Sequence, residues 1–70
     1  MIVYTPLWQT MKLRKITKYQ LVHKYGIAQN TISRMMESKP TSSKTINDLC
    51  KILNCKIEDI IKYVKDEDGP

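Results

Sequence analysis

One stretch, residues 17–34, constrains the fold of this chain more than any other part of its 70 residues. Apolar side chains such as Leu21 and Ile32 recur at helical spacing on both sides of Gly26. A glycine at this place ends one helix and permits the positive φ that a tight turn requires. The stretch therefore predicts two short helices joined by a turn, which is a helix-turn-helix.

The ends of this motif are also marked in the sequence. Thr17 is a good N-cap, and Gln20 stands three residues later, where it completes a capping box. Leu21, Val22 and Tyr25 are expected to face inward on the first of the two helices. The second should run from Ala28 or Gln29 to Ser38, with Ile32 and Met35 on its apolar side.

The opposite side of the second helix carries five polar residues, Gln29, Asn30, Ser33, Arg34 and Glu37, and the first four are expected to read bases. Amide, hydroxyl and guanidinium groups of this kind read base edges in the major groove of DNA. Gln29 and Asn30 suit adenine, Arg34 can reach guanine or a phosphate, and Ser33 is an adaptable neighbour. The alternative is that these residues form only the wet face that any amphipathic helix presents.

Charge is distributed unevenly along the chain. Residues 1–39 contain seven basic residues and one acidic residue, a net charge of +6. Residues 40–70 contain five basic and six acidic residues, a net charge of −1. The positive half holds the helix-turn-helix, as expected for a surface that faces phosphates, although a solvated basic face would look the same.

The remainder of the chain predicts three more helices and two irregular ends. The first helix should run from Pro6 to about Lys15, with apolar residues at Leu7, Trp8, Met11 and Leu13. A fourth helix should start at Ser42 or Ser43 and end at Asn54, with its apolar side formed by Ile46, Leu49, Cys50 and Leu53. A short fifth helix should follow, with its apolar side formed by Ile57, Ile60, Ile61 and Val64. Residues 1–5 form a short strand or a disordered arm, and residues 66–70 an acidic, frayed tail. We therefore expect one all-α domain over residues 1–70.

Catalytic, metal and membrane functions find no support in the sequence. It has no paired carboxylates, no phosphate-binding glycine loop and no nucleophile beside His23, so we expect no enzyme and no cofactor or small-molecule ligand. Cys50 and Cys55 are too widely spaced for a typical zinc site and are expected to be reduced, buried thiols. No signal peptide or membrane span is evident, so a cytoplasmic location is expected.

Five helices with this spacing resemble the lambda-repressor-like, or Cro/XRE, helix-turn-helix family. The resemblance covers about Leu7 to Val64, and its specific parts are Leu21, Gly26 and the sequence from Thr31 to Arg34. The later helices also fit, through Lys39-Pro40, Thr45-Ile46, Leu49 and Leu53 to Ile60. There are three departures from the family pattern. Val22 stands where the family prefers a small residue, and Ser38 where a glycine usually follows the third helix. Met11 and Met36 stand where members often carry an Arg and a Glu that pair, and we expect the two methionines to touch instead.

The resemblance implies that the third helix enters the major groove while the second lies across the backbone. On physical grounds, phosphates would be held near the second helix and at the start of the fourth, by Thr17, Lys18, Lys39, Thr41, Ser42 and Lys44. We expect a small transcriptional regulator, a repressor that occupies its operator in double-stranded DNA as a homodimer.

Two questions stay open at this point. The fold could instead serve as a protein-binding module, antitoxin-like or anti-repressor in kind, which should show an apolar patch on the third helix. The dimer contact is expected from the apolar residues at one or both ends, namely Ile2, Val3, Tyr4, Ile57, Ile61 and Val64. The alternative is that the N-terminal arm folds back on its own domain.

Overall fold

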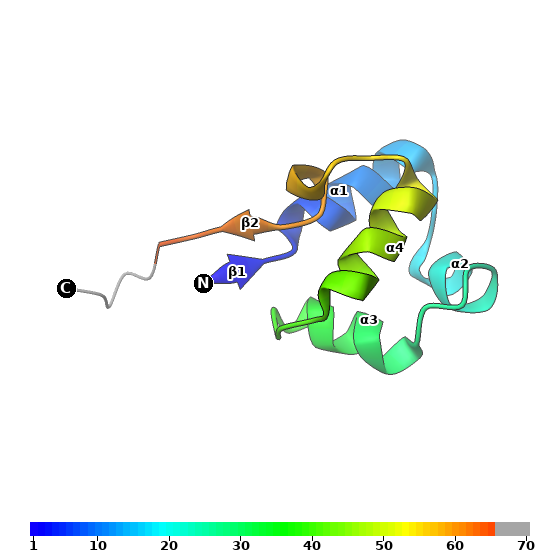
Figure 1. The fold of residues 1–70 in the computed structure, drawn as a ribbon. Helices are drawn as coiled ribbons and strands as arrows, with labels where there is room; N and C mark the ends of the chain where they lie inside the picture. Colours follow the sequence, from blue (N-terminus) through cyan, green and yellow to red (C-terminus); the bar gives the residue numbers. More distant parts are fainter. Residues whose placement is uncertain (66–70) are drawn as a thin grey trace.

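The structure, a computed structural model, describes residues 1–65, in which four α-helices surround one core and a two-stranded ribbon stands to one side (Figure 1). The elements follow in the order β1 (Ile2–Val3), α1 (Thr5–Arg14), α2 (Lys18–His23), α3 (Gln29–Met36), α4 (Ser43–Leu53), a single 3-10 turn η1 (Ile57–Asp59) and β2 (Lys62–Tyr63). The acidic tail expected at residues 66–70 lies outside the described residues.

The core draws on every helix. Its buried apolar side chains are Tyr4, Leu7, Met11, Leu21, Ile27, Ile32, Met35, Leu49, Leu53 and Ile60. Two residues expected to face inward do not. Leu13 is 82% exposed, because it lies two positions beyond Met11 and so points away from the buried side of α1. Tyr25 is 37% exposed, because α2 ends at His23 and helical periodicity no longer sets its direction.

The predicted helix starts are confirmed. The Gln20 N–H donates to Thr17 Oγ1 at 3.1 Å, and the Thr17 N–H donates to Gln20 Oε1 at 2.9 Å, which completes the capping box. Ser42 caps α4 by accepting from the Thr45 N–H at 3.2 Å. Gly26 has φ +77°, in the left-handed region that its turn requires.

Three helices end on a non-glycine residue in the left-handed region. Lys15, Ser38 and Asn54 follow α1, α3 and α4 with φ values of 59°, 59° and 51°. In each case the next N–H donates to a carbonyl five residues earlier: Ile16 to Met11 at 3.0 Å, Lys39 to Arg34 at 2.9 Å and Cys55 to Cys50 at 3.1 Å. This Schellman arrangement satisfies the last carbonyls of the helix. Ser38 thus takes up the conformation for which glycine was expected.

The predicted fifth helix is wrong. The chain forms only the turn η1, after which it extends into β2 and pairs antiparallel with β1, placing Ile2 opposite Tyr63 and Val3 opposite Lys62. Thr10 Oγ1 donates to the Asp59 carbonyl at 2.8 Å, the acceptor that a continuing helix would offer to Tyr63. Pairing with β1 then holds this segment extended.

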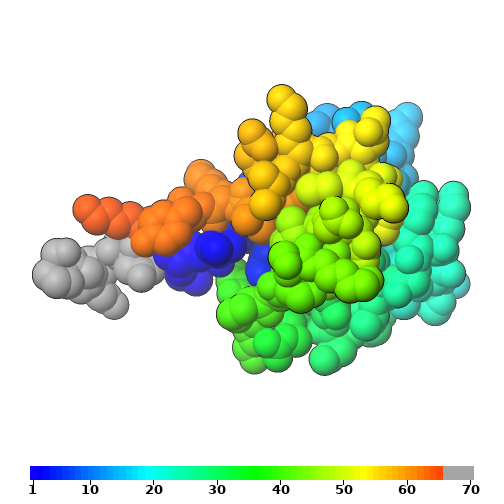
Figure 2. Space-filling view, in the orientation of Figure 1, coloured from blue at the N-terminus to red at the C-terminus, as the bar shows by residue number. Residues whose placement is uncertain are grey.

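The N-terminal residues therefore form a strand that pairs within its own chain. The β1–β2 ribbon projects from the helical body, with Ile2 and Tyr63 49% and 69% exposed (Figure 2). At its base, the Tyr4 hydroxyl donates to the Lys39 carbonyl at 2.9 Å, which ties the ribbon to the loop between α3 and α4. Among the described helices, none is long and apolar enough to cross a lipid bilayer.

Candidate nucleic-acid interface

Helix α3 is held on the surface by the turn that precedes it. Ile27 is buried, and its N–H donates to the Leu21 carbonyl at 2.9 Å, so the turn is fixed to α2 and to the core. In Figure 1, α3 runs along the lower edge of the molecule, with α2 on one side and the loop into α4 on the other. This placement leaves one side of α3 open along its length.

The four residues expected to read bases share that open side. Gln29, Asn30, Ser33 and Arg34 are all exposed, whereas Ile32 and Met35 are buried on the other side of the helix. Within residues 1–65 the four side chains make no hydrogen bond or ion pair with the protein. Their donors and acceptors are therefore available for an external partner, which fits a surface that hydrogen-bonds to base edges.

The amide end of α3 also differs from those of its neighbours. Thr17 and Ser42 cap α2 and α4 with a side-chain oxygen, but Ala28 precedes α3 and offers none. A helix N-terminus carries partial positive charge and backbone N–H groups that suit an anion. The start of α3 thus combines this charge with the amide side chains of Gln29 and Asn30.

The six residues expected to hold phosphates fall into two groups, one on each side of α3. Thr17 and Lys18 lie at the start of α2, and the second group, at the loop and the start of α4, consists of Lys39, Thr41, Ser42 and Lys44. All six are exposed except Thr41, which is half-buried. The structure therefore does not bring the six together at one point; it brackets α3 with them.

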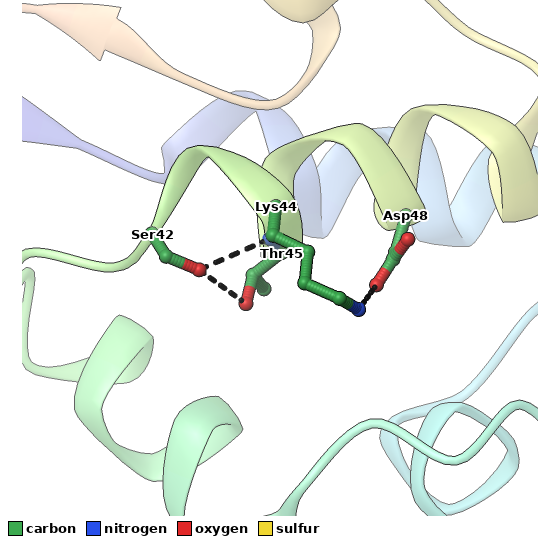
Figure 3. A network of polar contacts seen from close by, with 4 residues as sticks. All are labelled: Ser42, Lys44, Thr45 and Asp48. Atoms are coloured by element: carbon green, nitrogen blue, oxygen red, sulfur yellow. Dashed lines mark hydrogen bonds and ion pairs between the residues drawn. The ribbon is translucent and has the colours of Figure 1, made fainter.

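Each of the three expected lysines has a partner within the chain. Lys39 Nζ lies 3.0 Å from Glu37 Oε1, and Lys44 Nζ lies 3.0 Å from Asp48 Oδ2 (Figure 3). Lys18 Nζ lies 5.2 Å from the centre of the Trp8 ring. Exposed pairs of this kind contribute about 0–1 kcal/mol, so a phosphate can replace them at little cost.

Two of the three expected hydroxyl contacts, Thr17 and Ser42, already serve as helix caps. Thr17 Oγ1 accepts from the Gln20 N–H, and Ser42 Oγ lies 3.2 Å from the Thr45 hydroxyl as well as accepting from its N–H (Figure 3). Sequence reasoning identified both residues but missed Trp8 as the support for Lys18. Trp8 and Lys18 are ten positions apart on different helices, so spacing along one helix could not reveal their contact.

The cysteines do not form a reactive or metal-binding centre among residues 1–65. Cys50 and Cys55 are free thiols that are half-buried, not fully buried as expected, and no group of three or more ligand-type side chains gathers in this part of the chain. Burial raises the pKa of Cys55 to about 11, and the neighbouring Cys50 and Asp59 add to the effect. His23 lies on the surface, with its ring centre 4.2 Å from that of Tyr19.

The chain was compared with known proteins in three ways. The comparison with curated protein sequences gave no match. In a comparison with solved structures, the chain is similar to the crystal structure of the transcriptional regulator VanUg, with a TM-score of 0.84 and 25% identity, over 93% of this chain and 87% of that one. Residues 6–66 match the Cro/C1-type HTH DNA-binding domain. The chain belongs to the Cro/C1-type family of helix-turn-helix DNA-binding domains.

Proposed function

We propose that this protein is a transcriptional regulator that binds a specific sequence of double-stranded DNA through α3. The observation that carries the proposal is the division of α3 into two sides. Ile32 and Met35 anchor it in the core, while four exposed polar side chains without internal partners face outward. The structural likeness to a transcriptional regulator supports the same conclusion.

In the proposed complex α3 lies in the major groove. Gln29 and Asn30, at its amide end, make paired hydrogen bonds to adenine, and Arg34 reaches guanine O6 and N7 or a phosphate from the next turn. Ser33 supplies an adaptable contact beside them. Because the backbone of α3 is fixed to the core on its other side, these side chains meet the bases with little freedom to shift register.

The residues that bracket α3 hold the DNA backbone. Lys18, Lys39 and Lys44 exchange their internal partners for phosphates, and the hydroxyl groups of Thr17, Thr41 and Ser42 donate hydrogen bonds beside them. The basic N-terminal half of the chain adds a field that attracts DNA before these contacts form. Phosphate contacts supply affinity that weakens with salt, whereas the α3 contacts supply the sequence preference.

We further propose that the protein acts as a homodimeric repressor that blocks transcription by occupying its operator. A single domain offers only a few base contacts, each worth about 1–3 kcal/mol of discrimination. Two copies of the domain on a pseudo-palindromic site roughly double the part of the binding free energy that depends on sequence. The exposed apolar residues of the ribbon and its surroundings, Ile2, Ile57, Tyr63 and Val64, supply material for a contact between two copies.

The alternative function, a protein-binding module that keeps the fold, would place an apolar patch on α3. The exposed residues of α3 are amide, hydroxyl and guanidinium groups, together with one apolar residue, Met36, which is 55% exposed at the end of the helix and is too small by itself to form such a patch. The structure of this face therefore favours DNA.

Selection from a pool of random duplexes with the purified protein tests the proposal. We expect an enriched, pseudo-palindromic site. On that site Arg34→Ala and Asn30→Ala should each lose about 1–3 kcal/mol of specific binding while their binding to random DNA changes little. Lys18→Ala should weaken both and reduce the salt slope by about one, and Lys51→Ala, an exposed lysine on α4, serves as the control.

Two results would contradict parts of this proposal separately. Equal losses on selected and random DNA for the three variants would refute the assignment of the base-reading residues. Analytical sedimentation measures the oligomeric state at micromolar concentration, with and without the selected duplex. If the protein sediments as a monomer in both cases, the proposed homodimer is refuted, but the proposed DNA binding is not.

A further inference from the structure

A groove lies between α1 and the start of α2. Its volume is about 860 Å³. Three apolar side chains form its floor, Trp8, Met11 and Ile16, and three lysines stand on its rim, Lys12, Lys15 and Lys18. We call this feature the α1–α2 groove. The groove is of the size that proteins use to bind ligands and peptide segments.

The floor is firm and offers apolar surface to a partner. Met11 is buried in the core, and Trp8 and Ile16 are half-buried and packed against it, so the floor is not free to collapse. Lys18 lies over the Trp8 ring and helps to hold it in place. Covering this surface would remove apolar area from water, which favours association.

The rim is positively charged and lacks acidic neighbours. Lys12, Lys15 and Lys18 are exposed, and within the described part of the chain none of them forms an ion pair. No Asp or Glu precedes Glu37 in the sequence, and no carboxylate lines the groove. The three ammonium groups are thus uncompensated, around an apolar floor.

We propose that the α1–α2 groove binds an acidic peptide segment of a partner protein. Apolar side chains of the segment cover Trp8 and Ile16, and its carboxylates pair with the lysines of the rim. The apolar floor separates this occupant from DNA, because a phosphate backbone would satisfy the lysines but has no apolar group to bury between them. Charge complementarity and an apolar anchor together select an amphipathic acidic peptide.

Occupation of the groove regulates DNA binding if the proposed function is correct. Thr17 and Lys18 line the groove and also belong to the proposed phosphate contacts. A bound acidic segment would therefore compete with the operator for these residues. This consequence rests on the proposed function, whereas binding of the peptide does not.

The only tryptophan of the chain, Trp8, reports on the groove. A displayed library of random short peptides is selected on the full chain, and the enriched peptides are synthesised without tryptophan. Titration is followed by Trp8 fluorescence. We expect enriched peptides that combine Asp or Glu with large aliphatic residues and that shift the Trp8 emission.

Charge-reversed variants then locate the binding site. K12E/K15E should weaken the selected peptides at least about tenfold, because it reverses two rim charges but leaves Thr17 and Lys18 in place. K62E/K65E changes the same charge on the ribbon, outside the groove, and should weaken them less than about twofold at moderate salt. Thermal unfolding checks that both double variants fold.

Several outcomes would overturn the groove proposal: no enrichment, enrichment of peptides that are not acidic, unchanged Trp8 emission, or equal losses in the two double variants. Binding of a selected DNA duplex is measured on the same preparations. If the protein binds DNA but no peptide, only the groove proposal is refuted. If it binds peptide but no DNA, only the proposed function is refuted. If both bind, the selected peptide should displace the duplex, and simultaneous binding would refute the competition.

Discussion

The substitution Gly26→Ala isolates the energetic cost of the turn between α2 and α3. Gly26 has φ +77°, and an added Cβ would meet no heavy atom within 4 Å, so the change brings no steric clash. An L-residue in the left-handed region costs roughly 1–2 kcal/mol. Alanine also reduces the entropy of the unfolded chain, which returns about 0.4–1 kcal/mol. The net loss of unfolding free energy should therefore lie between about 0 and 1.6 kcal/mol, with a central value of about 0.8 kcal/mol.

Urea denaturation followed by far-ultraviolet circular dichroism measures this loss, and a loss of 1 kcal/mol should lower Tm by about 4–8 °C in a domain of this size. Ser38→Gly is the matched reverse change, because Ser38 holds φ 59° at the end of α3. It should raise stability by a similar amount. A loss above about 3 kcal/mol for Gly26→Ala would require a mechanism besides backbone strain. A destabilised Ser38→Gly would refute the reasoning at both positions.

Two further predictions concern single groups. Tyr4→Phe removes the hydroxyl that donates to the Lys39 carbonyl and should cost about 1 kcal/mol in urea unfolding, with no loss if that bond is absent in solution. The pKa of Cys55, raised to about 11 by burial, should make alkylation of this thiol in the folded protein at pH 8 slower than in urea, as followed by mass spectrometry of the tryptic peptide that carries Cys55. Because the unfolded thiol ionises first, the contribution of Cys55 to stability should fall as pH rises from about 9 towards 11, and a rise over that range would contradict the assigned direction.

The parts of the fold that sequence reasoning identified depend on neighbours in the chain. Thr17 and Gln20 lie three residues apart, Gly26 acts through its own backbone, and the burial of Ile32 and Met35 follows from helical periodicity. The predicted fifth helix is wrong because its segment depends on residues far away in the sequence. Thr10 bonds to Asp59 across 49 positions, and β1 lies beside β2, so partners far away in the sequence decide the conformation of this segment.

The same distinction between local and distant partners decides which parts of the candidate interface the sequence could predict. Exposure of the four α3 residues follows from the periodicity that buries Ile32, and the sequence predicted it. The groove did not emerge from the sequence, because Trp8 on α1 and Lys18 on α2 meet only after the two helices fold together. In the sequence Trp8 is one more member of an apolar stripe, and only the tertiary structure shows that it is half-buried and lines a groove.

The β1–β2 ribbon has a consequence for the order of folding. Met1 and Val64 bond to each other across 63 positions, so the ribbon closes a loop that contains nearly the whole described chain. In an otherwise unfolded chain, closing a loop of this length would cost roughly 4 kcal/mol of entropy, more than two short strands can offset. The helices, whose contacts are largely local, must first bring the two ends together. We therefore expect the ribbon to be the last element to form and the first to open.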